Sequence, residues 1–279
     1  MNNKKDYFTL ISTRVLLVVF LIFLLFPVYW MISTSFKDNS VLFKIPPEWI
    51  PQNPTIKNYV KLLSENYFLT YYKNSFIVSG GATVLTMFVA MFAGYGFSRF
   101  RFRAKNLIML LILSTQMFPV VSLLISLYTM YKNYGLLNNR FGLVLAMTTA
   151  SLPFSILMIK GFFDDISIHL EEAARIDGCG RFGILWRIIF PLAKPGFLAV
   201  GIYTFLLAWD DLLYSITLVN KDELRTLPSG ISMRYMGEFA YDWANVMTVC
   251  VTATIPVLIL FMFLQRYMVA GLTAGAVKG

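Results

Sequence analysis

Residues 171–178 read Glu-Glu-Ala-Ala-Arg-Ile-Asp-Gly, and Ile188, Phe190 and Pro191 follow shortly after them. Two adjacent acids, an arginine and an aspartate make this stretch too polar for the interior of a bilayer. Long apolar runs nevertheless lie on both sides of it. The sequence therefore predicts a short polar helix held outside the membrane by a membrane protein, and a helix this small suggests a docking element that transmits force.

The composition places the chain in a membrane. The mean hydropathy is +0.65, and 57% of the 279 residues are hydrophobic while 14% are charged, which is far more apolar than an ordinary soluble domain. A bilayer core about 30 Å thick takes roughly 20 helical residues to cross. Apolar runs of that length predict an all-α polytopic membrane protein with six transmembrane helices, at residues 15–32, 74–97, 106–130, 141–162, 195–218 and 244–265.

Prolines and small residues predict the shape of these helices. A proline within a span removes a backbone donor, so we expect a bend at each one. Ala90 and Gly94 form a small-xxx-small pair that favours tight packing against a neighbouring helix. The prolines within spans are Pro27, Pro119, Pro153 and Pro256.

The basic residues predict the orientation. A tight cluster, Arg99, Arg101, Arg103 and Lys105, separates the second and third spans, and such clusters stay in the cytoplasm. Both termini are then cytoplasmic, and the net charge of +9 is explained by inner basic residues and anionic lipid headgroups, with no nucleic-acid partner. The expected segments are a cytoplasmic N-terminus at 1–14, a transmembrane domain at 15–268 with an outer loop at 37–71 and a cytoplasmic loop at 163–194, and a cytoplasmic tail at 269–279.

Several chemistries lack the residues they need in this sequence. His169 is the only histidine, which leaves little for a histidine metal site or a Ser-His nucleophile. Cys179 and Cys250 are expected on different elements, so no disulfide is implied. The sequence has no G-x-x-x-x-G-K-[ST] phosphate loop. We therefore expect no catalytic residue, cofactor or metal, and any ATP must be hydrolysed by another chain.

The polar stretch carries the signals of a short capped helix. Ser167 is the expected N-cap, Glu171 and Arg175 form an i, i+4 pair, and Gly178 suits a left-handed stop. Alanines at its middle leave a shallow surface that the groove of another protein can approach. The same pattern also fits an ordinary loop helix that packs on its own chain. A second, amphipathic stretch at 181–190 is expected to lie against the membrane-side base of the spans through Phe182, Leu185, Trp186 and Ile189.

The complete spacing E-A-A-x3-G-x9-I-x-F-P, in an inner loop before the fifth span, resembles the signature loop of permease subunits of binding-protein-dependent ABC importers. Segments 43–51, 54–59, 208–211 and 264–279 resemble the carbohydrate-uptake branch of that family, the maltose-type second permease. Two positions depart from the pattern: Phe190 stands where Leu is usual, and Asp210 stands where Asn is usual.

The resemblance implies a type I ABC importer permease fold, in a sugar importer of the bacterial inner or plasma membrane. This chain would pair with a second, homologous permease, above two ATPase subunits and below an extracytoplasmic solute-binding protein. The E-A-A helix would sit in a cleft of the ATPase, which alone hydrolyses ATP. The residues expected to couple the ATPase to the pathway are Glu171, Glu172, Ala173, Ala174, Asp177 and Gly178.

The fifth span carries a second candidate site. On one continuous helix, Tyr203, Asp210 and Tyr214 share a stripe and Asp211 lies on the adjoining one. A carboxylate at mid-membrane costs roughly 2.5–3.5 kcal/mol, so this face should point into protein or toward water. A sugar pathway and a polar seam against the partner permease fit equally well. The candidate residues are Tyr203, Trp209, Asp210, Asp211 and Tyr214.

Two other functions are considered. A secondary solute transporter, not driven by ATP, would carry its own coupling-ion site and often shows repeat symmetry between its halves, with broken helices facing each other at the midplane. A membrane-embedded enzyme would need clustered acids or histidines. Neither pattern is found in the sequence, and the E-A-A loop would have no role in either case. The secondary transporter is kept as the alternative.

Overall fold

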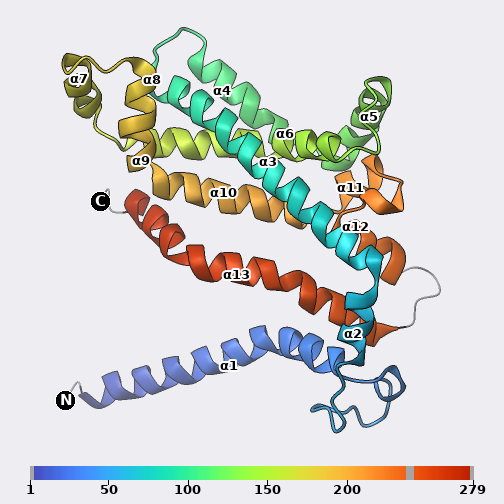
Figure 1. Cartoon of the computed structure of the whole chain (residues 1–279). Helices are drawn as coiled ribbons and strands as arrows, with labels where there is room; N and C mark the ends of the chain where they lie inside the picture. The colour runs from blue at the N-terminus through green and yellow to red at the C-terminus, as the bar shows by residue number, and fades with distance from the viewer. Residues whose placement is uncertain (1–2, 237–241, 277–279) are drawn as a thin grey trace. The chain divides into compact units, whose positions relative to one another are not determined.

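The computed structural model describes the backbone of residues 3–236 and 242–276, and the side chains of residues 10–236 and 242–263. In this part of the chain all regular structure is helical. Clustering of contacts divides the chain into two compact units, one formed by residues 1–66 and 231–255 and the other by residues 67–230 and 256–279. Figure 1 labels the elements of both.

The first unit is built around the end of α1 (Asn3–Ser35). The backbone oxygen of Ser35 accepts hydrogen bonds from Asn58 Nδ2 at 3.0 Å and from Thr248 Oγ1 at 3.3 Å. The predicted outer loop is therefore anchored on the end of the first helix. This unit also contains η1 (Asn39–Val41), α2 (Lys57–Ser64), η5 (Ile231–Tyr235) and the first turns of α13 (Trp243–Ala276).

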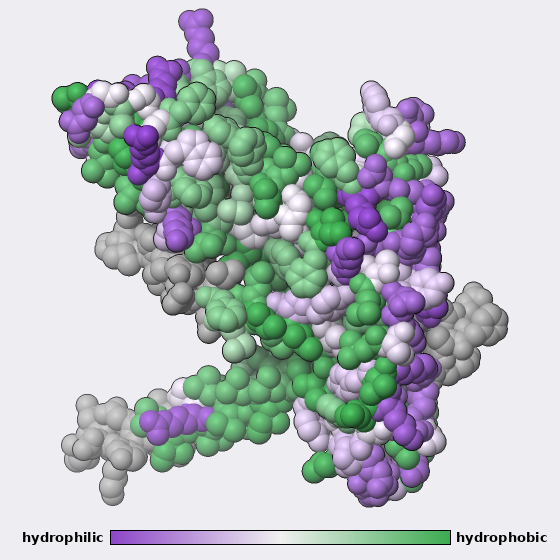
Figure 2. Space-filling model, in the orientation of Figure 1, coloured by the Kyte–Doolittle hydropathy of each residue, from purple (hydrophilic) through white to green (hydrophobic). Residues whose placement is uncertain are grey.

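The outer surface of α1 is apolar from Val15 to Phe26. Its most apolar stretch, within residues 10–35, has no buried side chain, and Figure 2 shows it covered by hydrophobic side chains. A surface of this kind is stable in contact with lipid or with another apolar protein surface, and not in water. Such an exposed apolar surface is expected of the first predicted transmembrane helix, at residues 15–32.

The second unit packs three long helices together. These are α3 (Asn66–Arg99), α6 (Arg140–Asp164) and α10 (Lys194–Trp209), and α6 and α10 run side by side in Figure 1. A Cβ added at Gly94 would lie 2.8 Å from Ile159 Cγ2 and 3.1 Å from the backbone nitrogen of Lys160. The close packing predicted from Ala90 and Gly94 is therefore confirmed, between α3 and α6.

The third predicted span is not a single helix. It is divided into α4 (Lys105–Ser114), η2 (Thr115–Met117) and α5 (Val120–Asn133), with a bend of 101° between the two halves. Pro119 stands at the N-cap of α5, where its missing N–H costs nothing because the first turn of a helix has no acceptor for it. The continuous helix expected over 106–130 is wrong, and the bend expected at Pro119 is confirmed.

The fifth predicted span is also interrupted. Helix α10 ends at Trp209, and α11 (Leu213–Leu218) begins after a break. The single helix expected over 195–218 is therefore wrong. A helix of 16 residues measures about 24 Å, less than the bilayer core of about 30 Å, so α10 needs the segments next to it to complete a crossing.

The predicted polar helix and the amphipathic stretch at 181–190 form four short helical elements in succession. Leu185 and Ile189 are buried as expected, whereas Phe182 and Trp186 are exposed. The expectation that Phe182 packs inward is wrong, whereas the half-exposed ring of Trp186 packs on Phe190 at a centroid distance of 5.5 Å. The elements are α7 (Ile168–Ile176), α8 (Arg181–Ile184), η3 (Leu185–Ile189) and α9 (Phe190–Leu192); η4 (Asp222–Leu224) and α12 (Leu227–Gly230) follow α11.

The apolar segments agree with the predicted number of spans. Four helices are long and apolar enough to cross a membrane, and two bent helix pairs would raise the number to six if each pair forms one span. Helix α13 continues to Ala276, so most of the predicted tail at 269–279 is helical backbone. Its last residues, 277–279, lie outside the described residues.

Replacing Gly94 by alanine should destabilise the protein, because the new methyl group meets Ile159 and the backbone of α6. Overpacking of this kind costs about 1–3 kcal/mol. The matched control is Gly96→Ala in the same helix, where nothing lies within 4 Å of an added Cβ. Thermal unfolding of the purified protein should show a lower Tm for Gly94→Ala only, and equal values for the two variants would contradict this packing.

Candidate functional site

The polar helix α7 has the boundaries that its sequence predicts. It starts after Ser167, in the N-cap position, although the side chain of Ser167 makes no capping hydrogen bond. It ends at Ile176, and Gly178 adopts φ +84°. The N–H of Cys179 then donates to the oxygen of Ala174 at 2.9 Å. Residues with a side chain rarely adopt this φ. The left-handed stop expected at Gly178 is therefore confirmed.

The two faces of α7 differ in exposure. Glu171 and Ala174 are buried, whereas Glu172, Ala173, Asp177 and Gly178 are exposed. Ile176, on the outer face, is 87% exposed. Only four of the six predicted coupling residues can therefore meet another protein, and Ala173 alone, of the two alanines, forms the shallow outer surface.

Glu171 is bound within its own chain. Its carboxylate accepts a hydrogen bond from the hydroxyl of Tyr95 at 2.9 Å and another from Arg99 Nε, and its side chain is fully buried. Arg175, the partner expected from the i, i+4 spacing, lies at 4.0 Å, the outer limit for an ion pair. The main partners of Glu171 are thus on α3, not on α7.

Glu172, in contrast to Glu171, has an exposed side chain. Its carboxylate lies 3.0 Å from His169 Nδ1, and both side chains are largely exposed. An exposed pair of this kind contributes little to stability. The carboxylate of Glu172 is consequently available to a cationic group of a partner, whereas that of Glu171 is not.

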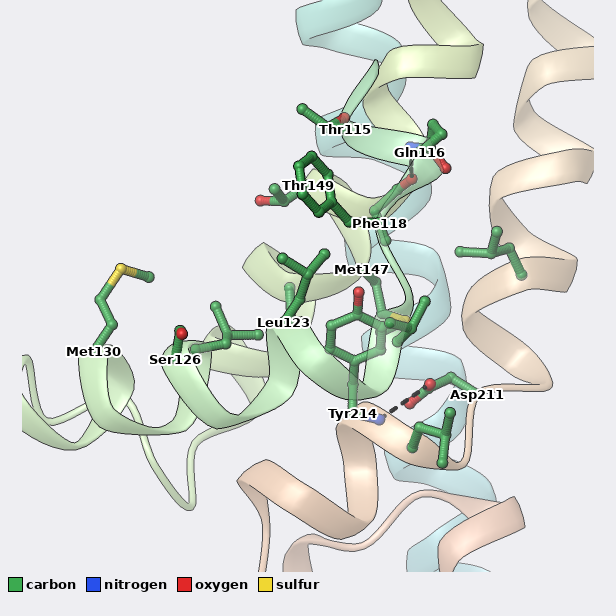
Figure 3. Close-up of a pocket in the computed structure, with 16 residues that line it drawn as sticks. Thr115, Gln116, Phe118, Leu123, Ser126, Met130, Met147, Thr149, Asp211 and Tyr214 are labelled. Carbon is green, nitrogen blue, oxygen red and sulfur yellow. Dashed lines mark hydrogen bonds between the residues drawn. The ribbon is translucent and has the colours of Figure 1, made fainter. Parts of the chain in front are cut away.

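A cavity of about 630 Å³ lies within the second unit, at the bend between η2 and α5 and beside the break after α10. Figure 3 shows Tyr214 projecting from the start of α11 into this space. Most of the wall is apolar. Its polar side chains come from η2, α5, α6 and the region of the break: Thr115, Gln116, Ser126, Thr149, Asp211 and Tyr214.

The break after α10 separates the predicted pathway residues. Asp211 and Tyr214 both line the cavity, but Asp210 is exposed and does not. The carboxylate of Asp211 accepts hydrogen bonds from the N–H groups of Tyr214 at 3.2 Å and Ser215 at 3.0 Å. The stripe of Tyr203, Asp210 and Tyr214 expected on one helix does not exist, because Asp211 starts a new helix instead of continuing the old one.

Two predicted pathway residues belong to aromatic packing. The ring of Trp209 contacts Phe76 at a centroid distance of 4.9 Å and Tyr72 at 5.7 Å, and its side chain is buried. Tyr203 packs on Phe154 at 4.7 Å. Neither Trp209 nor Tyr203 lines the cavity.

The sequence analysis missed the residues on the facing wall of the cavity. Gln116 lies in the cavity wall and its Nε2 donates to the oxygen of Ala150 at 3.0 Å. The signal was present: a glutamine within an apolar run, three residues before Pro119. Arg99 was missed as a partner of Glu171 because its basic cluster was interpreted only as an orientation signal.

Metal ligands do not gather in the described part of the chain. Among its side chains, no group of three or more His, Cys, Asp or Glu residues is arranged to hold a metal ion. Cys179 and Cys250 are both free cysteines. The two sites present carboxylates, hydroxyls and apolar surface.

Comparison with known proteins identifies relatives over nearly the whole chain. Residues 86–273 match the family described as binding-protein-dependent transport system inner membrane component. The sulfoquinovosyl glycerol transport system permease protein of Agrobacterium fabrum is 39% identical over 255 residues, covering 91% of this chain and 89% of that protein. The trehalose/maltose transport system permease protein of Thermococcus litoralis is 32% identical over 272 residues, covering 95% and 97%.

A solved structure has the same fold. It is a crystal structure of a bacterial ABC transporter involved in the import of the acidic polysaccharide alginate. One of its chains superimposes with a TM-score of 0.82 at 24% identity, over 94% of this chain and 97% of that one. The likeness therefore covers nearly the whole of both chains and shows a shared fold.

Two neighbouring glutamates provide a test of the buried pair. Glu171→Ala leaves Arg99 without its carboxylate, and breaking a buried ion pair costs about 3–5 kcal/mol. Glu172→Ala removes only an exposed carboxylate, so its effect should stay within about 0.5 kcal/mol. Denaturant unfolding of the purified protein measures both, and equal losses of stability would show that Glu171 is not bound as described.

Proposed function

The chain belongs to the family of binding-protein-dependent transport system inner membrane components, and from this membership we propose that it is a membrane-spanning subunit of an ATP-driven sugar importer. It forms one half of the translocation pathway and couples closure of the ATPase to alternating access. The observation that carries this function is the divided E-A-A helix, which is fixed to its own chain by one face and presents Glu172 and Ala173 on the other.

The substrate class follows from the relatives. The permease proteins of Agrobacterium fabrum and Thermococcus litoralis are named for the transport of sulfoquinovosyl glycerol and of trehalose and maltose. These compounds all carry sugar rings, so a carbohydrate is the proposed cargo. The alternative of a secondary transporter is not favoured, because these relatives are permease proteins of transport systems and the exposed face of α7 would have no partner.

The proposed assembly has four kinds of partner. They are a second homologous permease, two ATPase subunits, an extracytoplasmic solute-binding protein and the sugar itself, within a bacterial inner membrane. In this assembly both termini and α7 lie in the cytoplasm. The exposed residues Glu172, Ala173, Asp177 and Gly178 contact the ATPase, and closure of the ATP-bound dimer moves α7 with it.

The cavity at the break after α10 is assigned to the translocation pathway. Its hydroxyl, amide and carboxylate groups can donate to and accept from a sugar, and Phe118 and Tyr214 offer rings for the apolar faces of sugar rings. Of the five residues predicted from sequence, Asp211 and Tyr214 are retained in this proposal. Tyr203, Trp209 and Asp210 are not, because they lie outside the cavity.

A cysteine at position 173 should crosslink to the ATPase subunit. The experiment uses Ala173→Cys in a chain whose Cys179 and Cys250 are replaced by serine, within the complete complex in native membranes. The matched control is Ala174→Cys, the adjacent position on the buried face, which should give no crosslink. Absence of the Ala173→Cys crosslink across several linker lengths would contradict docking of α7.

Purification of the tagged chain from native membranes should recover an ATPase, a second permease and, with substrate present, a solute-binding protein. Sugars added singly to the reconstituted complex should identify the cargo as the one that raises the ATPase rate. The control is the purified chain alone in vesicles. Uptake by the chain alone, without ATP or partner, would establish the secondary transporter instead.

A further inference from the structure

We propose that Glu171 is a positioning residue that fastens the coupling helix α7 to α3, so that movement of α7 reaches the pathway through α3. The inference rests on the proposed docking of α7 to an ATPase and changes the role of one predicted coupling residue. Glu171 holds the helix from inside the subunit, and only Glu172 of the two acids faces the ATPase.

The first step of the argument is the connection between α7 and α3. Both carboxylate oxygens of Glu171 are occupied by α3, one by the hydroxyl of Tyr95 and the other by Arg99 Nε. Arg99 also donates from Nη2 to the oxygen of Ile166, at 2.9 Å. One guanidinium therefore holds the turn before α7 and the first turn of α7 together, and both are attached to the same helix.

The second step concerns apolar packing around these polar contacts. Ala174, one turn after Glu171 on the same face, is buried in a hydrophobic cluster that includes Tyr95, Phe97 and Phe163. The ring of Tyr95 lies edge-on to that of Phe163 at a centroid distance of 5.9 Å. Hydrogen bonds between charged groups are stronger where water is excluded, so the buried network restricts α7 more than an exposed network of equal size would.

The third step is what α3 contacts at its other end. Asn74 donates from Nδ2 to the backbone oxygens of Glu223 at 3.0 Å and Arg225 at 2.8 Å, and Ser75 Oγ accepts from the N–H of Leu227 at 2.7 Å. Positions 74 and 99 belong to one unbroken helix and are about 38 Å apart along its axis. A displacement applied at Arg99 is therefore delivered to the 222–227 segment after α11.

These contacts distinguish Glu171 from the exposed motif residues. A residue that docks on a partner must be accessible, and Glu171 has no exposed surface. A residue that only caps a helix would contact its own backbone, yet the hydrogen bonds described for Glu171 go to side chains of a different helix. The geometry therefore assigns it to transmission between helices.

The test measures sugar moved per ATP hydrolysed by equal amounts of assembled complex. The variants are Glu171→Gln, which keeps the shape but removes the charge, and Tyr95→Phe, which removes one donor and keeps the packed ring. Both should lower this ratio by about tenfold, the factor that corresponds to one hydrogen bond to a charged group. The Ala173→Cys crosslink to the ATPase should persist in both.

The matched control is Tyr131→Phe. The Tyr131 hydroxyl is also buried and donates to a backbone oxygen, that of Gly142, at 3.2 Å, but it is not part of the α7 network. Tyr131→Phe should leave the ratio of transport to ATP hydrolysis at the wild-type value. A purely structural role for Glu171 would reduce the amount of complex recovered and leave that ratio unchanged.

Three results decide the proposal. A wild-type ratio in both Glu171→Gln and Tyr95→Phe would overturn it, and so would a crosslink from Glu171→Cys to the ATPase, since Glu171 would then face outward. Absence of the Ala173→Cys crosslink in a chain with the natural Glu171 and Tyr95, and with Cys179 and Cys250 replaced by serine, would instead overturn docking itself. The failure of this inference and the failure of the proposed function are thus separately visible.

Discussion

Backbone polar groups inside a bilayer have no water to bind, and this constraint governs where the chain can stop being helical. Two of the breaks in the described helices lie inside predicted spans, at residues 118–119 and 210–212. After Trp209 a side chain takes over part of the backbone hydrogen bonding, and beside Pro119 a side chain ties the chain to α6. Gln116 donates to the oxygen of Ala150, and Asp211 accepts from the N–H groups of Tyr214 and Ser215. Gln116 and Asp211 both line the cavity, so side chains that hold the chain at the two breaks also contribute to its polar lining.

The period of a helix explains how a motif of eight residues serves two purposes. Adjacent residues on a helix point about 100° apart, so Glu171 and Glu172 face different surroundings although they are neighbours and chemically identical. One is fully buried against Arg99 and the other is more than half exposed. Ala174 is buried and Ala173 is exposed in the same way. One half of the motif therefore attaches α7 to its own chain and the other half is exposed, and the residue types alone do not distinguish the two halves.

Much of the fold could be predicted from sequence because lipid imposes length and composition. The helices α3 and α6 appear where long apolar runs predict them, and Gly178 ends α7 as its residue type requires. The break after Trp209 could not be predicted in this way, since the run continues apolar through Leu212 and Leu213 while the deciding hydrogen bonds are made by one aspartate. The pairing of Arg99 with Glu171 joins positions 72 residues apart, and no local pattern contains it. The exposed residues of the candidate site could therefore be predicted from sequence, whereas the contacts of Glu171 with Tyr95 and Arg99 could not.

The strong exposure of Ile176 beside Glu172 has a consequence for the life of the subunit before assembly. Ile168 and Leu170 are also about half exposed on α7. In the proposed assembly, a subunit without its partner would therefore expose these apolar side chains to water. Covering one such side chain completely gains about 1.5–3 kcal/mol, so the proposed ATPase partner would gain binding free energy from these side chains as well as from the carboxylate of Glu172. On the proposed function, the side chains that favour docking leave an uncovered apolar surface on α7 in a subunit that lacks its partner.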